Sequence, residues 1–414
     1  MKRIEIPLVK ERDWLYRIFE MVPGILTWST LALPVLLSFF APTLAAYFIV
    51  AYLLMWFFKT LFMNIRMAQG YRRLQQSTAM DWYRHAQELD NPDEAFERYP
   101  EGISPAWHYR NMVRHRARLG DRARLNELYH AIIIAVYNET PEIIEPTLQS
   151  VASSNFPLDK LVVIFAVEER GGEVVHKNVQ KLVSAYKDTF KDIAMVIHPK
   201  DIPNEVIGKG GNITYAGKWA DDYFKKQAIP AEHVIVTTLD ADNRPHPQYF
   251  AAVSYAYLGC PDPIHASFQP ISIFTNNIWD VPAPMRVIAT GNSFWNIVLG
   301  LRPHMIRNFA SHSQTLKTLQ DTDFWSTRTI VEDGHQFWRT YFRYNGRHEV
   351  HPMMVPIYQD AVLDVNYRKT LKAQFIQIRR WAWGASDVAY VLQKGWRQKN
   401  EVPKLDLLFK TSRL

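Results

Sequence analysis

Cysteine is almost absent from this 414-residue chain, which contains only Cys260. A single cysteine excludes an internal disulfide and fits a reducing compartment. No cluster of Cys and His residues accompanies it in the sequence, which argues against a zinc site or a thiol nucleophile. We therefore interpret Cys260 as a small residue of the core.

Charged residues are absent from Val22 to Phe58. This run is too long for one crossing, because a helix rises about 1.5 Å per residue and the hydrocarbon core is roughly 30 Å thick. We predict two spans, at 22–40 and 43–63, with the turn at Pro42. A cleaved signal peptide is the alternative, but its apolar region would be only about 7 to 15 residues long. Basic residues on both flanks predict that both ends lie in the cytoplasm.

The composition has no bias towards disorder, since 48% of residues are hydrophobic and 13% are aromatic. The net charge is +7, and the positive charge is concentrated beside the apolar run and in the stretch 110–124. No zinc-finger or RNA-recognition signature accompanies it, so we expect an anionic membrane surface and no nucleic acid as the partner. The flanking cations are Lys2, Arg3, Lys10, Arg12, Arg17, Lys59, Arg66, Arg72 and Arg73.

Short apolar runs alternate with helical stretches after about residue 128. Continuous apolar strands separated by helices predict an α/β fold with a mainly parallel sheet, in which ligands bind at the carboxyl ends of the strands. A helix is expected to begin at Pro141. The predicted strands are 130–136, 160–167, 192–198 and 233–239.

Polar side chains follow these strands. The tips read Tyr137-Asn138-Glu139, Glu168-Glu169, Pro199-Lys200 and Asp240-Ala241-Asp242. Asn138 or Glu139 can instead cap the helix that begins at Pro141, and the sequence leaves both interpretations open. Asp240 and Asp242 are two residues apart in an extended segment, so both can face one hard cation such as Mg²⁺ or Mn²⁺. The alternative for this pair is an acidic turn.

Further motifs complete a resemblance to a known family. They are Lys209-Gly210-Gly211-Asn212-Ile213-Thr214-Tyr215-Ala216, Val331-Glu332-Asp333 followed by Arg339, and Gln377-Ile378-Arg379-Arg380-Trp381. With Asp240-Ala241-Asp242, they make the segment 128–384 resemble a family 2 inverting glycosyltransferase, especially the membrane-embedded branch that includes cellulose and hyaluronan synthases. The resemblance implies a GT-A catalytic domain, Rossmann-like with a mainly parallel sheet, after an N-terminal two-helix transmembrane hairpin.

The resemblance also implies a role for each residue. Asp333 would be the general base, and the dipole of the helix that it begins would keep it ionised. Capping of that helix by Glu332 and Asp333 is the alternative. Asp240 and Asp242 would hold Mg²⁺ or Mn²⁺. The donor would contact Tyr137, Asn138, Glu139, Glu168, Lys209, Asn212 and Asp240, and the acceptor or diphosphate would contact Glu332, Gln377, Arg380 and Trp381.

The chain departs from the family pattern in three places. Glu168 and Glu169 stand where an aspartate commonly contacts the nucleobase, and Thr214 replaces an asparagine. The membrane branch commonly has further spans after the Gln377–Trp381 motif, whereas this sequence ends at Leu414. Two interpretations stay open: the sequence is part of a longer protein, or it is a short form with only the front hairpin.

These observations predict a membrane-bound, multi-pass inverting glycosyltransferase of the inner membrane, with its catalytic domain in the cytoplasm. Its substrates would be a nucleotide-sugar donor, UDP-linked, and a glycan or lipid-linked acceptor. The alternative is a non-catalytic membrane subunit that binds sugar nucleotide or glycan and regulates a partner synthase. The expected organisation is a basic segment (1–21), the hairpin (22–63), a polar and basic linker or interfacial helices (64–128), the GT-A domain (129–363), and an interfacial helix with the C-terminal tail (364–414).

Overall fold

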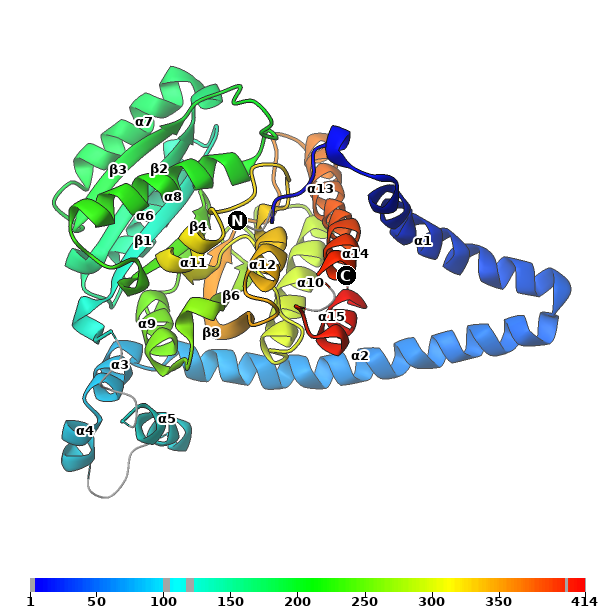
Figure 1. Ribbon diagram of the computed structural model, residues 1–414, viewed down its shortest axis with the longest axis horizontal. Helices are drawn as coiled ribbons and strands as arrows, with labels where there is room; N and C mark the ends of the chain where they lie inside the picture. The colour runs from blue at the N-terminus through cyan, green and yellow to red at the C-terminus, as the bar shows by residue number, and fades with distance from the viewer. Residues whose placement is uncertain (1–3, 100–104, 117–122, 399–400, 414) are drawn as a thin grey trace.

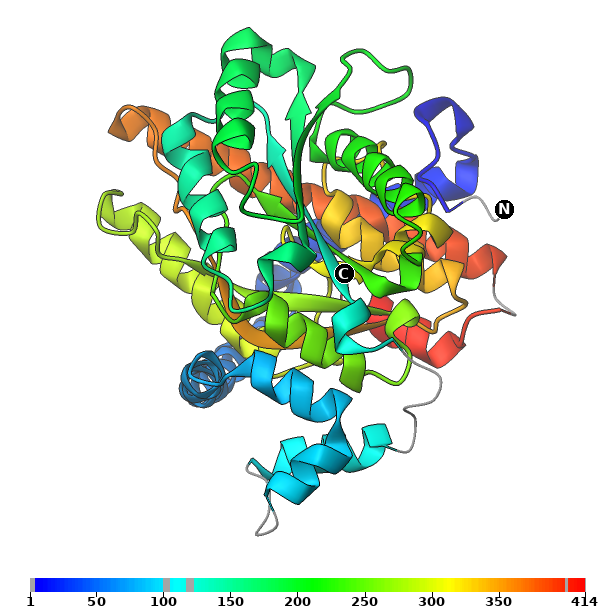
Figure 2. The same ribbon diagram turned by 90° about the vertical axis from the view of Figure 1, so that its left-hand side faces the viewer.

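The computed structural model describes residues 4–99, 105–116, 123–398 and 401–413. Lys2, Arg3, Leu414 and part of the basic stretch 110–124 therefore lie outside the described residues. Figures 1 and 2 show an α/β domain built around a twisted sheet, with two long helices that extend from one side of it.

Eight strands form one mixed sheet within the described residues, in the order β3-β2-β1-β4-β7-β6-β8-β5. β1 to β4 are parallel, while β7 runs antiparallel to β4 and β6, and β5 runs antiparallel to β8. The four strands predicted from sequence are present, each within one residue of its expected bounds. The strands are β1 (Tyr129–Val136), β2 (Leu161–Glu168), β3 (Asp192–His198), β4 (Val234–Asp240), β5 (Arg244–Pro245), β6 (Ala266–Phe274), β7 (Ser313–Thr315) and β8 (Glu349–Gln359).

Both faces of the parallel half of the sheet are buried. In β1, Ile132 and Ile134 join the apolar core on one face, and Ile133 joins the core on the other. This alternation follows from the two-residue period of a strand. The first face is covered by α6 (Pro141–Ala152), α7 (Gly172–Ala185) and α9 (Tyr249–Gly259), and the second by α8 (Lys209–Lys226) and α11 (Leu316–Asp321).

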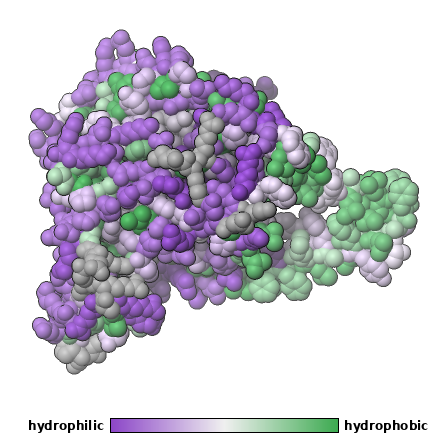
Figure 3. Space-filling view, viewed as in Figure 1, coloured by the Kyte–Doolittle hydropathy of each residue, from purple (hydrophilic) through white to green (hydrophobic). Residues whose placement is uncertain are grey.

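Two N-terminal helices, α1 (Trp14–Phe40) and α2 (Pro42–Thr78), meet at the predicted turn. Both are long and apolar enough to cross a membrane, and only 0% and 6% of their most apolar windows are buried. Figure 3 shows hydrophobic residues gathered over this hairpin, away from the polar α/β domain. α2 continues beyond the expected end of the hairpin at residue 63 and packs against the α/β domain, where Leu74 contacts the Ile271 and Ile297 cluster.

The described part of the segment expected to be a linker contains three α-helices after the end of α2, namely α3 (Trp82–Asp90), α4 (Pro92–Arg98) and α5 (Ala106–Arg116). Trp82 of α3 and Trp107 of α5 contact Tyr255 of α9 through their rings, at centroid distances of 5.2 Å and 5.8 Å. These aromatic contacts attach the segment to the α/β domain.

The remaining helices lie around the other half of the sheet. α12 (Glu332–Arg343) contributes Phe337, Trp338 and Phe342 to a third core, where Tyr390 of α14 (Asp387–Arg397) joins them. α10 (Ala283–Gly300) packs on β6 and against α2. The other two helices are α13 (Tyr367–Ala382) and α15 (Lys404–Thr411).

Candidate active site

A cavity of about 550 Å³ lies at the carboxyl ends of β1, β2 and β4, between the start of α12 and the end of α13. Its volume is in the usual range for a small-molecule site. Every site residue predicted from sequence lines it, with the exception of Asn138. The lining residues from those predictions are Tyr137, Glu139, Glu168, Lys209, Asn212, Asp240, Asp242, Glu332, Asp333, Gln377, Arg380 and Trp381.

Lys209 and Asp240 form an ion pair inside this cavity. Asp240 is the last residue of β4, and Lys209 is the first residue of α8. The Lys209 Nζ lies 2.5 Å from Asp240 Oδ1 and also donates to the Ala310 carbonyl oxygen at 3.1 Å. Burial acts to lower the pKa of Lys209, but the charges of Asp240 and Glu332 outweigh it and raise this pKa. The lysine is therefore charged in the cavity.

Asp242 lies beside a third carboxylate, Asp360, which the sequence analysis did not identify. Asp360 follows directly after β8, and its backbone N–H donates to Asp242 Oδ2 at 3.1 Å. Burial raises the pKa of Asp242 to about 7, and the charges of Asp240 and Asp360 act in the same direction. A protein environment that penalises several neighbouring carboxylates in this way is suited to a bound cation.

The three carboxylates fit a divalent metal ion. Asp360 Oδ1 is buried and has no hydrogen-bond partner among the described residues. Oxygen ligands are the preferred donors for Mg²⁺ and Mn²⁺. Asp240 and Asp242 would hold the ion as predicted, and Asp360 would add a third oxygen ligand.

Glu332 and Asp333 begin α12, as predicted. Val331 occupies the N-cap position without a side-chain capping bond, and Asp333 Oδ1 accepts the Gly334 N–H at 2.7 Å. Burial raises the pKa of Glu332 to about 8, and the charge of Asp333 adds to this effect. Both carboxylates line the cavity, so capping does not account for their position.

Asp333 differs in one respect from its sequence-based expectation. The helix dipole was expected to keep it ionised, but burial raises its pKa, while the Gly334 N–H and the charge of Lys209 oppose the rise. Burial outweighs the dipole because desolvation penalises the charged form directly. A raised pKa makes Asp333 a stronger base.

The Gln377–Trp381 motif lies on α13, the helix predicted for it. Gln377, Arg380 and Trp381 reach the cavity because positions i, i+3 and i+4 of a helix share one face. The charge of Arg380 acts on Asp333. Trp381 is 43% exposed and Trp383 is 58% exposed, which leaves ring surface for a sugar or for a lipid headgroup.

The turn after β1 does not cap α6 as one interpretation of Asn138 and Glu139 expected, because Thr140 occupies the N-cap position and no side-chain capping bond is formed there. Glu139 Oε2 accepts the backbone N–H groups of Tyr137 and Asn138, at 2.7 Å and 3.1 Å. Glu139 therefore stabilises its own turn, while Tyr137 and Glu139 also line the cavity. Asn138 is not among the lining residues, and its predicted contact with the donor has no support from this cavity.

Glu168 lies at the end of β2 and is held by a histidine. His198 Nδ1 lies 3.3 Å from Glu168 Oε2, and His198 Nε2 lies 3.0 Å from Glu205 Oε2. Arg170, a further lining residue that sequence reasoning missed, lies 3.7 Å from the same Glu168 oxygen. A lone arginine in a short 3-10 turn carries no sequence signal that would reveal this position.

Asn212 connects the ends of two strands to the cavity. Its Nδ2 donates to the Ala166 carbonyl oxygen at 2.8 Å, and its Oδ1 is buried without a hydrogen-bond partner among the described residues. A buried amide oxygen that lacks a partner is available to a ligand. Asn212 therefore fits its predicted role in donor binding.

Arg339 belongs to the sequence motif but is not a lining residue. Its guanidinium is buried behind α12, where it donates to the carbonyl oxygens of Phe324 and Thr322 and pairs with Glu5. This position indicates a supporting role for Arg339.

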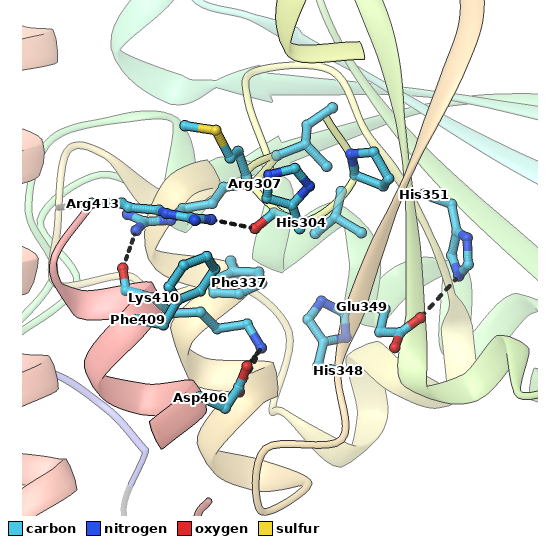
Figure 4. Close-up of a pocket in the computed structure, with 14 residues that line it drawn as sticks. His304, Arg307, Phe337, His348, Glu349, His351, Asp406, Phe409, Lys410 and Arg413 are labelled. Atoms are coloured by element: carbon cyan, nitrogen blue, oxygen red, sulfur yellow. Dashed lines mark hydrogen bonds and ion pairs between the residues drawn. The ribbon is translucent and has the colours of Figure 1, made fainter. Parts of the chain in front are cut away.

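A second cavity, of about 370 Å³, lies between β8, α12 and α15. Figure 4 shows Arg307 and Arg413 beside His304, with Phe337 below them. Arg307 stacks at 4.9 Å on the ring of Trp338, and Lys410 is paired with Asp406 at 2.5 Å. None of the sequence-predicted site residues lines this cavity.

One other cluster, outside both cavities, has side chains typical of a metal site. His85 and His108 both hydrogen-bond to Glu88 Oε2, at 3.1 Å and 3.0 Å. The second ring nitrogen of His108 hydrogen-bonds to the Tyr255 hydroxyl at 3.0 Å. These hydrogen bonds account for the cluster without an ion.

A family model matches the part of the chain that carries much of this site. Residues 235–411 match the model described as glycosyl transferase family group 2. The chain is therefore similar to family 2 glycosyltransferases over 177 of its 414 residues. The matched segment includes Asp240, Asp242, Asp333, Asp360 and Arg380.

None of the curated proteins matches this chain significantly. Among solved structures, S. aureus TarS 1–349 is 14% identical and has a TM-score of 0.37, over 56% of this chain and 60% of that chain. The mannosyltransferase PcManGT from Pyrobaculum calidifontis, in complex with GDP-Man and Mn²⁺, is 16% identical and has a TM-score of 0.38, over 80% of this chain and 91% of that chain. These low TM-scores carry no argument about a donor or an acceptor of this chain.

Proposed function

We propose that this protein is a membrane-bound inverting glycosyltransferase. It transfers a sugar from a nucleotide donor, UDP-linked, to a polysaccharide or lipid-linked acceptor at the cytoplasmic face of the inner membrane. The observation that carries the proposal is the cavity that brings Asp333, Lys209 and Arg380 together with the carboxylates that follow β4.

Asp333 acts as the general base in a single displacement. Its carboxylate takes the proton from the acceptor hydroxyl while that oxygen attacks the anomeric carbon. The bond between the anomeric carbon and the phosphate oxygen breaks on the opposite side, and the nucleotide diphosphate leaves with the bonding electrons. One base is sufficient for this reaction, and the configuration at the anomeric carbon inverts.

The protein stabilises the leaving group with positive charge. Lys209 and Arg380 both line the cavity, and a guanidinium can bind diphosphate oxygens through two hydrogen bonds. A divalent ion held by Asp240, Asp242 and Asp360 would supply further charge neutralisation as a Lewis acid. Fixed cations placed where negative charge develops lower the barrier without reorganisation.

The hairpin formed by α1 and α2 supports placement at the membrane. On α13, next to the lining residues, Phe375, Ile376 and Ile378 are exposed. Apolar side chains beside a cavity and an exposed apolar hairpin together fit an active site close to the lipid surface. This arrangement supports an acceptor that reaches the cavity from the membrane.

The test is release of nucleotide diphosphate by the detergent-solubilised protein across a panel of sugar nucleotides, with and without Mn²⁺ or Mg²⁺ and with membrane lipid extract as acceptor. We expect metal-dependent release from one donor, and loss of release in Asp333→Asn and Asp242→Asn. Glu173→Gln is the matched control, because this side chain is 88% exposed and lies outside the cavity. Donor binding without release from any donor would instead support a non-catalytic binding subunit.

A further inference from the structure

The N-terminal segment lies against the helix that carries Asp333, although more than 300 residues separate them in the chain. The Tyr390 hydroxyl of α14 donates to the Ile4 carbonyl oxygen at 2.6 Å, and Arg328 donates to the Ile6 carbonyl oxygen at 3.1 Å. Ile6 is buried in the same core as Phe337 of α12. Figure 1 shows this segment passing beside α12 and α14 before α1 begins.

Glu5 is inserted at the centre of these contacts. Its Oε2 lies 3.3 Å from Arg339 NH2, and its Oε1 accepts a hydrogen bond from the Ser326 hydroxyl. Burial acts to raise the pKa of Glu5, but the charges of Arg339 and His335 outweigh it, so this pKa is lowered. The carboxylate is therefore charged at neutral pH.

Arg339 connects Glu5 to the active-site helix and to the preceding loop. Its side chain is 2% exposed, and it donates to the Phe324 and Thr322 carbonyl oxygens at 2.5 Å and 2.8 Å. A buried guanidinium surrounded only by carbonyl oxygens would be poorly compensated, and Glu5 supplies the opposite charge. Arg339 is six residues after Asp333 in α12, about 9 Å along the helix axis.

The loop 322–331 provides a second connection between Glu5 and the cavity. Ser326, which donates to Glu5, also lies against Gly210 at the start of α8, next to Lys209. Ile330 and Val331, at the end of the loop, line the cavity directly. A change at Glu5 can therefore move both Asp333 and the Lys209 region.

We propose that Glu5 is a positioning residue that holds Asp333 in place through Arg339. The inference rests on the proposed function, because it assigns Asp333 the role of base. Glu5 lies nine residues before Trp14, the first residue of α1, so this ion pair connects the segment that leads into the hairpin to the active-site helix. Displacement of a reacting group by about 1 Å can reduce the rate by two orders of magnitude, which gives the ion pair a measurable effect on turnover.

The experiment compares Glu5→Gln with Glu20→Gln in the full chain. Glu20 is a matched control, because it pairs with Arg12 and Arg17 near the start of α1, away from Arg339. The probe is the sugar nucleotide that gives the fastest diphosphate release in the donor panel. We expect Glu5→Gln to lower kcat at least tenfold per folded molecule, with donor KM unchanged within twofold, and Glu20→Gln to retain wild-type kcat.

Hydrogen–deuterium exchange of residues 331–340 provides a second readout that does not depend on turnover. We expect faster exchange in Glu5→Gln and near wild-type exchange in Glu5→Asp, which keeps the charge and recovers part of kcat. Should Glu5→Gln fail to fold, Glu5→Asp is judged by kcat alone against Glu20→Asp, with a smaller loss of kcat expected.

Two results would overturn the proposal. One is an unchanged kcat per folded molecule in Glu5→Gln, even with a lower Tm, because a purely structural role predicts that pattern. The other is unchanged exchange at 331–340. If the wild type releases no diphosphate from any donor, the proposed function fails by itself, and the exchange result alone decides whether Glu5 holds α12.

Discussion

Lys209 Nζ and Asp240 Oδ1 are 2.5 Å apart, which joins a cation expected to bind donor phosphates to a carboxylate expected to bind a metal ion. The lysine occupies the position of a counter-ion for Asp240. A metal ion or a diphosphate that enters the cavity must therefore share or replace this contact. Affinity for the metal ion and affinity for the nucleotide should consequently respond in opposite directions when the lysine charge is removed.

We expect Lys209→Met to bind Mn²⁺ more tightly than the wild type in the absence of nucleotide, and to lose about tenfold or more in donor affinity, since a charged hydrogen bond contributes about 1.5–3 kcal/mol. Isothermal titration with Mn²⁺ and then with UDP measures both quantities. Lys225→Met is the control, because Lys225 pairs with Asp221 at the same 2.5 Å distance near the other end of α8. Weaker Mn²⁺ binding with unchanged UDP affinity would contradict this interpretation.

Asp360→Asn should have opposite effects on stability and on metal binding. Without metal, the substitution removes one of several neighbouring buried carboxylates, so we expect Tm in EDTA to rise by about 2 °C. Loss of an oxygen ligand should weaken Mn²⁺ binding about tenfold. Differential scanning fluorimetry with and without Mn²⁺ separates the two effects. Asp364→Asn, at an exposed position on the same loop, is the control and should change neither the Tm in EDTA nor the affinity for Mn²⁺. A lower Tm in EDTA for Asp360→Asn would refute the account.

The parts of the site that sequence could predict are those that follow regular elements. Asp240 and Glu168 end strands whose apolar runs are evident, and Gln377 and Arg380 lie on a helix with a clear period. Asp360 was missed because β8 carries two prolines and a register shift opposite Pro270 and Ile271, which obscure its strand pattern. Glu5 was missed because its partner Arg339 is distant in the chain, and local pattern says nothing about such a contact.

His198 should make stability depend on pH through its two carboxylate partners. Burial acts to lower the pKa of His198, but hydrogen bonds and charges from Glu168 and Glu205 outweigh it, so this pKa is raised in the folded state. The stabilisation is complete below the unfolded-state pKa of about 6.5 and is lost as pH rises through the raised value.

We therefore expect His198→Gln to lower Tm more at pH 6 than at pH 9, as measured by scanning fluorimetry across this range. Glu205→Gln removes one of the two partners and should reduce the pH dependence only in part. An equal loss of Tm at both pH values would show that His198 contributes by packing alone.

Gly210 permits the close contact between α8 and the loop 322–331. A Cβ at this position would lie 2.2 Å from the Ser326 carbonyl oxygen and 3.1 Å from Glu332 Cβ. We expect Gly210→Ala to destabilise the protein by about 1–3 kcal/mol, because backbone has to move, and to lower kcat by displacing Lys209 and Glu332. The matched control is Gly291→Ala in α10, where a Cβ meets no atom within 4 Å; it should stabilise by about 0.5–1 kcal/mol through helix propensity. Thermal denaturation of both variants and of the wild type in detergent tests this expectation. A Tm of Gly210→Ala equal to that of the wild type would show that the loop moves aside without cost.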